Sequence, residues 1–184
     1  RLLPVFADVV SRLHMQRPGL RFVLPAAPNV ASIVRDAAGA WRVPIHVLDA
    51  QDLARKRAAF SAADVALAAS GTVSLELAAA ATPMVIAYDM NWLSRQIIGR
   101  MLRVDTVTLV NLVSETRVVP EFIGTACRPG PIAAEVLRTL DAPTAQADAM
   151  ALTMDRLGKD GPAPGERAAL AVLNGLETRA DRTT

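Results

Sequence analysis

In the first half of the chain, segments with helical spacing of hydrophobic residues alternate with short, continuous apolar runs. Over residues 2–16 they recur every three or four positions and stop at Pro18-Gly19, which predicts an amphipathic helix. Short apolar runs bounded by Gly, Pro or polar residues predict strands. The expected helices cover residues 2–16, 30–39, 53–60 and 73–81, and the expected strands cover residues 20–24, 45–48, 65–69 and 84–88. On the third helix, the basic run Arg55 to Arg57 is expected to face solvent.

This alternation of helices and strands with short connections predicts βαβ units. Such units place their strands in parallel, and right-handed crossovers bring helices onto both faces of the sheet. The expected fold class is therefore α/β, a doubly wound parallel sheet with C-terminal helices. After Tyr88 the pattern loosens into a helix from Trp92 to Arg103, a weak strand around Val107 to Val110 and an irregular stretch to Gly130.

The chain is expected to consist of two parts. Residues 1–141 form the sheet domain and residues 142–184 a helical extension, in which the loop GKDGPAPG precedes the last helix, at about Glu166 to Arg179. Such a loop permits the trailing helix to exchange between two copies, so a homodimer is one hypothesis. The chain begins with Arg-Leu-Leu-Pro rather than Met, and we expect it to be a piece of a longer protein.

Composition and charge narrow the classes of function. The 184 residues carry 20 basic and 18 acidic side chains, too small an excess for a protein that binds a phosphate backbone. Aromatic residues make up 4%, too few for stacking of nucleobases, so no nucleic-acid partner is expected. No apolar run reaches the roughly 18 residues of a membrane span. The single cysteine, Cys127, excludes a disulfide framework, and we expect a soluble domain.

A small polar turn follows the strand expected at residues 65–69. In Ser70-Gly71-Thr72 the glycine allows an anion to approach the backbone, and the hydroxyls of Ser70 and Thr72 can donate hydrogen bonds to it. Ligands of open α/β sheets bind beyond the carboxyl ends of the strands, where helix N-termini attract phosphate. Alternatively, Thr72 only caps the helix and Gly71 only makes the turn.

Glu76 lies one turn inside the helix that follows this loop. Helical side chains lean toward the helix N-terminus, so its carboxylate is expected beside the phosphate site. A carboxylate there is suited to accept hydrogen bonds from two sugar hydroxyls, and a ribose next to a diphosphate supplies them. Alternatively, Glu76 is a first-turn acid that complements the helix dipole.

Several motifs together resemble the lipid-A-disaccharide synthases. They are Ala69-Ser70-Gly71-Thr72, Leu75-Glu76, Thr82-Pro83-Met84-Val85, Asn111-Leu112 and Val118-Val119-Pro120-Glu121, with Arg1-Leu2-Leu3-Pro4 and Arg21-Phe22-Val23-Leu24-Pro25 fitting the same family. The resemblance runs to about Asp141 and implies the C-terminal, nucleotide-sugar-binding half of a GT-B glycosyltransferase, built from Rossmann-like domains. It also implies transfer of 2,3-diacylglucosamine from its UDP derivative to 2,3-diacylglucosamine 1-phosphate, with inversion and release of UDP. This step of lipid A synthesis would occur on the cytoplasmic face of the bacterial inner membrane.

The resemblance also assigns roles to individual residues. Ser70, Gly71 and Thr72 would cradle the diphosphate of UDP, and Glu76 would bind the ribose. Asn111 and Glu121 would line the donor side of the cleft.

Without the resemblance, Asn111 is interpreted as a turn residue and Glu121 as a helix-start acid. The chain departs from the family pattern at one place. Glu115-Thr116 stand where family members often have Gly-Arg, so that Arg117 is displaced by one position.

Parts of the family pattern would lie before Arg1, namely a strand, a Gly-Ser-Arg loop and the acceptor-binding domain. We therefore expect this chain to bind its donor without catalysing transfer, and we expect no cofactor. His14 lies in a helical run and His46 in a strand candidate, so both are interpreted as packing or surface residues rather than the general base. One Cys and two distant His provide no metal site.

The helix expected from residue 92 to residue 103 has two unlike sides. Leu93, Ile97, Ile98, Met101 and Leu102 share one side, and Trp92, Arg95, Arg100 and Arg103 share the other. Tryptophan among arginines suits the anionic headgroups of a membrane surface, and so predicts peripheral lipid contact. The alternative is a helix packed on the core with a solvated basic face.

Two other classes of function stay open at this point. Another UDP-sugar enzyme of the same architecture, a peptidoglycan N-acetylglucosaminyltransferase or an epimerase, would also place an acid about one turn after a Ser/Gly loop. A non-enzymatic nucleotide-binding or assembly module would use the C-terminal helices to pair subunits. The Asn-Leu and Val-Val-Pro-Glu motifs favour the lipid A enzyme.

Overall fold

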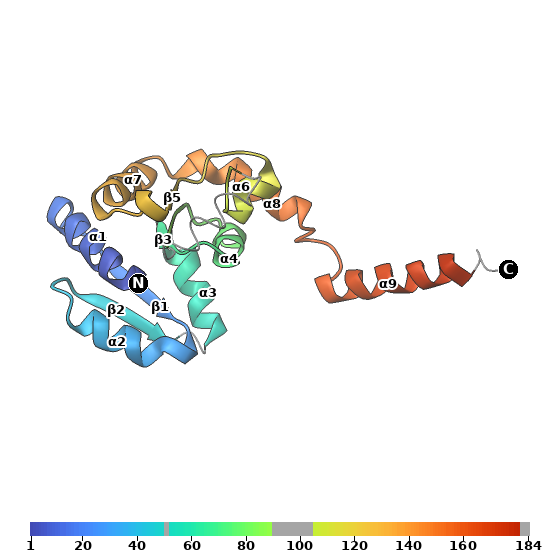
Figure 1. Ribbon diagram of the computed structural model, residues 1–184, viewed down its shortest axis with the longest axis horizontal. Helices are drawn as coiled ribbons and strands as arrows, with labels where there is room; N and C mark the ends of the chain where they lie inside the picture. Colours follow the sequence, from blue (N-terminus) through green and yellow to red (C-terminus); the bar gives the residue numbers. More distant parts are fainter. Residues whose placement is uncertain (50–51, 90–104, 181–184) are drawn as a thin grey trace.

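The computed structural model describes residues 1–49, 52–89 and 105–180 (Figure 1). The strands are β1 (Phe22–Ala26), β2 (Ile45–Asp49), β3 (Ala66–Ala68), β4 (Met84–Tyr88) and β5 (Glu121–Ile123). The helices are α1 (Leu2–Gln16), α2 (Ala31–Gly39), α3 (Leu53–Ala62), α4 (Val73–Ala79), α6 (Leu109–Ser114), α7 (Pro129–Asp141), α8 (Ala147–Arg156) and α9 (Pro164–Ala180). Short 3-10 turns are η1 (Pro28–Val30), η2 (Gly124–Ala126) and η3 (Pro143–Gln146).

The expected alternation of helices and strands is confirmed as far as Tyr88. The strand expected at Val107 to Val110 is wrong, because α6 begins at Leu109 and the next strand is β5. In α6 the buried positions Val110 and Ser114 are four residues apart, which is helical spacing, so burial of one helix face overrides the β-propensity of the Val-rich run. The helix expected at residues 92–103 lies outside the described residues.

All observed strand pairs are parallel, and they form two sheets. The first sheet pairs β1 with β2, and the second has the order β3-β4-β5. In the second sheet, Ala68 lies opposite Ile86, and Ile86 lies opposite Glu121. Each consecutive pair of strands from β1 to β4 is joined through a helix, as parallel strands require.

Helices cover both faces of the central strand, β4. Met84 and Ile86 pack in one core cluster with residues of α4, α6 and α8, whereas Val85 and Ala87 pack in another with residues of α1 and α7. All four side chains are fully buried, because successive residues of a strand point to opposite faces and both faces are covered. The expected doubly wound α/β fold is therefore confirmed.

Helix α1 connects the two sheets. Its residues Val9 and Leu13 belong to the cluster that contains Phe22 of β1 and Leu67 of β3. Leu3, at the start of α1, packs instead on the small cluster between α2 and the first sheet. The two sheets therefore share one packed body although no hydrogen-bonded ladder joins them.

The two last helices differ in their packing. Met150 and Met154 of α8 belong to the core cluster that includes α4. In contrast, α9 extends away from the body (Figure 1), with Leu170, Val172 and Leu173 about half exposed. Among the described residues, no helix has the length and apolar character that crossing a membrane requires.

Candidate functional site

The loop Ser70 to Thr72 connects the carboxyl end of β3 to the start of α4. Gly71 has a φ of 141°, in a region that side-chain-bearing residues rarely adopt. A Cβ atom at this position would meet nothing within 4 Å, so the backbone conformation rather than crowding requires glycine. The space next to the Gly71 backbone, where a Cβ would project, is therefore open.

The hydroxyl groups around this loop have different partners. Ser74 Oγ donates to the carbonyl oxygen of Gly71 at 2.9 Å, and Ser70 Oγ donates to that of Val107 at 3.4 Å. Thr72 occupies the N-cap position of α4, but its side chain makes no capping hydrogen bond. The capping interpretation of Thr72 is therefore wrong, and its exposed hydroxyl points to no backbone N–H of the helix.

Glu76 forms an ion pair across two helices. Lys56 Nζ of α3 lies 2.6 Å from Glu76 Oε2 of α4, with side chains 21% and 43% exposed, respectively. The expectation that Lys56 faces solvent with its neighbours is therefore wrong. Arg55 does face outward, at 77% exposure, and pairs with the N-cap residue Asp52. Sequence spacing missed Lys56 because its partner comes from another helix.

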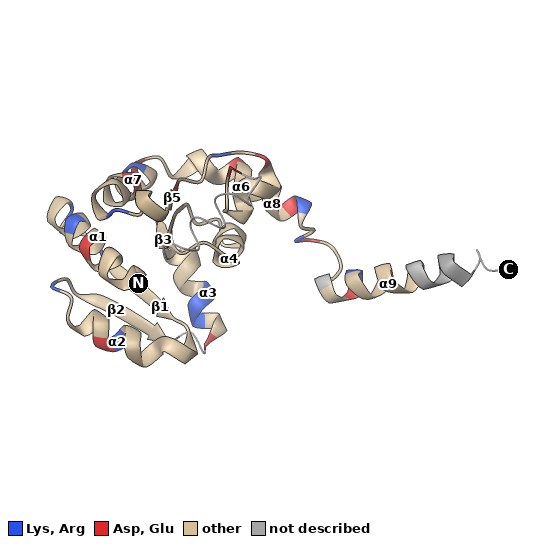
Figure 2. Cartoon of the chain, viewed as in Figure 1, with Lys and Arg blue, Asp and Glu red and all other residues tan. Residues whose placement is uncertain are grey.

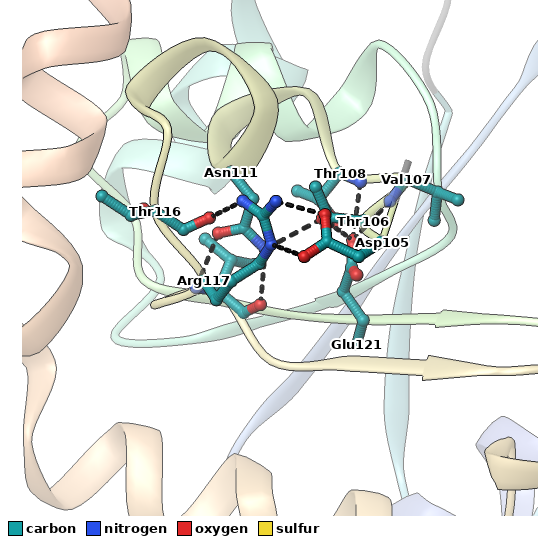
Figure 3. Close-up of polar contacts among 9 residues, drawn as sticks. Asp105, Thr106, Val107, Thr108, Asn111, Thr116, Arg117 and Glu121 are labelled. Carbon is teal, nitrogen blue, oxygen red and sulfur yellow. Dashed lines mark hydrogen bonds and ion pairs between the residues drawn. The ribbon is translucent and has the colours of Figure 1, made fainter. Parts of the chain in front are cut away.

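The carboxylate of Glu121 holds a neighbouring loop in place (Figure 3). Its Oε1 accepts hydrogen bonds from Thr106 Oγ1 at 2.8 Å, from the N–H of Val107 at 3.0 Å and from the N–H of Thr108 at 2.6 Å. Since Val107 in turn accepts the hydrogen bond of Ser70, the structure brings Glu121 and the loop after β3 into one network. Glu121 begins strand β5, so its interpretation as a helix-start acid is wrong.

Asn111 lies in α6 and is 1% exposed, so its interpretation as a turn residue is wrong. Its Nδ2 donates to the carbonyl oxygen of Val119 at 2.9 Å and to Thr106 Oγ1 at 3.3 Å, and its Oδ1 accepts from the N–H of Val119 at 3.0 Å. The amide thus ties the approach to β5 to the loop that Glu121 holds (Figure 3).

Arg117 is paired with Asp105 at the outer side of this network (Figure 3). Its Nε donates to Asp105 Oδ2 at 3.0 Å, and its Nη2 donates to Oδ1. Hydrogen bonding to this guanidinium lowers the pKa of the Asp105 carboxyl, and the same contact raises the pKa of Arg117. At the end of α6, Glu115 adopts a left-handed conformation with a φ of 60°.

Charged side chains and potential metal ligands are both dispersed over the described residues. Basic and acidic residues are interspersed along the described elements (Figure 2), in keeping with the small net charge. Within the described ranges no group of three or more His, Cys, Asp or Glu residues could hold a metal ion. The expected lipid-contact residues lie outside these ranges, and they are Trp92, Arg95, Arg100 and Arg103.

Comparison with known proteins identifies the family. A family model described as lipid-A-disaccharide synthetase matches residues 1–172. The chain belongs to the lipid-A-disaccharide synthase family. It is 55% identical to a lipid-A-disaccharide synthase of Ruegeria pomeroyi over 96% of the chain, and 41% identical to that of Rhodospirillum centenum over 99%. A Gluconobacter oxydans relative of the same name is 34% identical over the whole chain.

The chain spans about half the length of these curated relatives. It covers 45% of the Ruegeria protein, 46% of the Rhodospirillum protein and 45% of the Gluconobacter protein. Membership of the lipid-A-disaccharide synthase family supports the resemblance seen in the motifs over the two other classes, another UDP-sugar enzyme and a non-enzymatic module.

Proposed function

We propose that this chain is the donor-binding half of a lipid-A-disaccharide synthase. The complete enzyme transfers 2,3-diacylglucosamine from its UDP derivative to 2,3-diacylglucosamine 1-phosphate and releases UDP. The family match over residues 1–172 and the names of the relatives support this proposal. The chain spans about half of those relatives, and we propose that the acceptor site and the general base lie in the part of the enzyme that it does not span, so that this chain alone binds without catalysing.

The loop Ser70 to Thr72 is proposed to bind the diphosphate of UDP. Two features support this role: the open space at the Gly71 backbone and the Thr72 hydroxyl, which makes no capping hydrogen bond. Both are available to an anion at the carboxyl end of β3. During inverting displacement at the anomeric carbon, charge develops on the departing diphosphate. N–H and O–H donors already fixed at this loop would stabilise that charge without reorganisation.

Glu76 is proposed to bind the ribose, and Asn111 and Glu121 to shape the donor side of the cleft. Glu76 lies one turn after the loop, and its side chain leans back toward it. Asn111 and Glu121 act through the segment they hold, because their hydrogen bonds fix residues 106–108 next to Ser70. The proposal rests on the open, glycine-requiring loop and on the partly exposed carboxylate of Glu76, which lies in the first turn of the helix that follows.

Calorimetric titration of the chain tests this assignment. UDP should bind more tightly than UMP because the second phosphate contacts the loop. Hydrogen bonds to a charged group are worth about 1.5–3 kcal/mol, so Glu76→Ala should weaken UDP binding roughly 10- to 150-fold. Folding should survive, because losing a first-turn acid costs about 0.3–1 kcal/mol.

The control ligand is 2′,3′-dideoxy-UDP, which lacks the hydroxyls that Glu76 would accept from. The Glu76→Ala variant should lose most of the preference for UDP over this analogue, whereas Asp36→Ala, an exposed acid on α2, should keep it. Equal binding of both ligands by the unmodified chain would rule out Glu76 as the ribose ligand.

We further propose that the enzyme acts at the cytoplasmic face of the inner membrane as a peripheral protein. The support is the sequence pattern at residues 92–103, where Trp92 stands among Arg95, Arg100 and Arg103. Such a surface suits the anionic headgroups of the lipid substrates and of the membrane that holds them.

A further inference from the structure

We propose that Lys56 is a positioning residue of the nucleotide site, which holds the Glu76 carboxylate in the orientation that the ribose requires. The inference rests on the proposed ribose-binding role of Glu76. The contact joins Lys56 Nζ to Glu76 Oε2 at 2.6 Å, and it links helices that lie on either side of β3 in the chain. A charge-assisted hydrogen bond of this length restricts the rotamers of an otherwise exposed glutamate.

The ammonium group of Lys56 is itself held by its surroundings. It lies 5.4 Å from the centroid of the Phe60 ring, within the range of a cation–π contact. Phe60 packs against the core cluster of α4, and its carbonyl oxygen accepts a hydrogen bond from Thr82 Oγ1 at 2.6 Å. Lys56 therefore contacts Glu76 from the part of α3 that packs on the core. Its neighbour Arg57 is exposed.

The ion pair leaves room for a ligand on the same carboxylate. An ionised carboxylate has about four lone-pair sites on its two oxygens. Lys56 contacts one of them, on Oε2. Two ribose hydroxyls can therefore donate to the remaining sites, so the pair orients Glu76 without competing with the sugar.

The measurable consequence is a change in ligand preference. In Lys56→Met the Glu76 carboxylate keeps its charge but loses its orientation, so the preference for UDP over 2′,3′-dideoxy-UDP should fall. Partly exposed ion pairs contribute modestly, which corresponds to a fall of about two- to five-fold. Lys56→Arg should retain most of the preference, and Arg57→Met, one residue away on the exposed side of α3, should retain all of it.

Titration of all four proteins with both ligands, alongside thermal melts, tests the inference. A general loss of positive charge or of folding would weaken both ligands equally and leave the preference unchanged, which would overturn the role of Lys56. If Lys56→Met melts at a lower temperature, Lys56→Gln tests the same contact with a polar side chain. An unmodified chain that binds UDP and the dideoxy analogue equally overturns the ribose role of Glu76 and the Lys56 inference together. One that binds neither contradicts the donor-binding function itself.

Discussion

At the scale of single residues, the motif positions act as a network rather than as separate ligands. Glu121 accepts hydrogen bonds from residues 106–108, and Asn111 bonds to Val119. Residues 106–108 adjoin the loop after β3, because Ser70 donates a hydrogen bond to Val107. Side chains that hydrogen-bond to several backbone groups favour one arrangement of the surrounding backbone. Within this motif, Asn111 and Glu121 therefore hold the backbone that adjoins the loop after β3.

Glu115 provides a prediction at this scale. A side-chain-bearing residue in the left-handed region costs about 1–2 kcal/mol, and glycine removes this cost while adding about 0.5–1 kcal/mol of chain entropy to the unfolded state. Glu115→Gly should therefore raise the free energy of unfolding by about 0.5–1 kcal/mol and the Tm by about 1–4 °C. Glu115→Ala is the matched control, because it removes the 3.5 Å contact with Arg156 but keeps the left-handed backbone. Equal melting temperatures for Glu115→Gly and the unmodified chain would show that this position carries no strain.

At the scale of elements, burial rather than propensity decides which segments become helices. The Val-rich run before Asn111 forms α6 because Val110 and Ser114 then reach the same core as α8. Helix α9 is the opposite case, since its apolar residues Leu170, Val172 and Leu173 lie exposed beside no other element of the body. Leu170 and Leu173 are three residues apart and share one face of α9, and an exposed apolar stripe of this kind is typical of a surface that another chain or domain covers.

Removal of α9 should therefore change assembly and leave the fold intact. A chain ending at Leu157 keeps Met150 and Met154 of α8 in the core, so its circular dichroism should retain the signal of the sheet domain. We expect the full chain to form a homodimer and the shortened chain to be monomeric by light scattering. Leu173→Glu in the full chain is the matched control, because it places a charge on the apolar stripe without shortening the helix. An unchanged mass in both variants would exclude α9 as the dimer contact.

At the scale of the whole molecule, the described strands form two separate sheets, and we predict that one added strand would join them. Phe22 of β1 and Leu67 of β3 pack in one cluster, yet no hydrogen-bonded ladder joins their strands. A further strand between β1 and β3, connected to the start of α1, would complete a right-handed βαβ unit. The resulting order, β2-β1-x-β3-β4-β5, is the 3-2-1-4-5-6 order of a dinucleotide-binding fold when the added strand x is counted first.

A chain that carries an added strand-forming segment before Arg1 tests this arrangement. The added strand should pair with both open edges, so amide protons of β1 and β3 should exchange more slowly and the Tm should rise. An extension of equal length at the C-terminus is the control and should change neither. Unaltered exchange in β1 and β3 of the N-terminally extended chain would mean that the two sheets are separate.

The hydrophobic pattern by itself determined the α/β class, the order of elements up to Tyr88 and the loop that carries Gly71. These features depend on local spacing, because a strand buried on both faces is continuously apolar and a helix covering it is periodic. Only the tertiary structure decided that Lys56 meets Glu76, that Asn111 binds Val119 and that Glu121 holds residues 106–108. Each of these contacts joins two different elements or an element to a loop. The geometry of these contacts depends on how helices and strands pack against each other. The spacing of residues along a single helix or strand does not predict that packing.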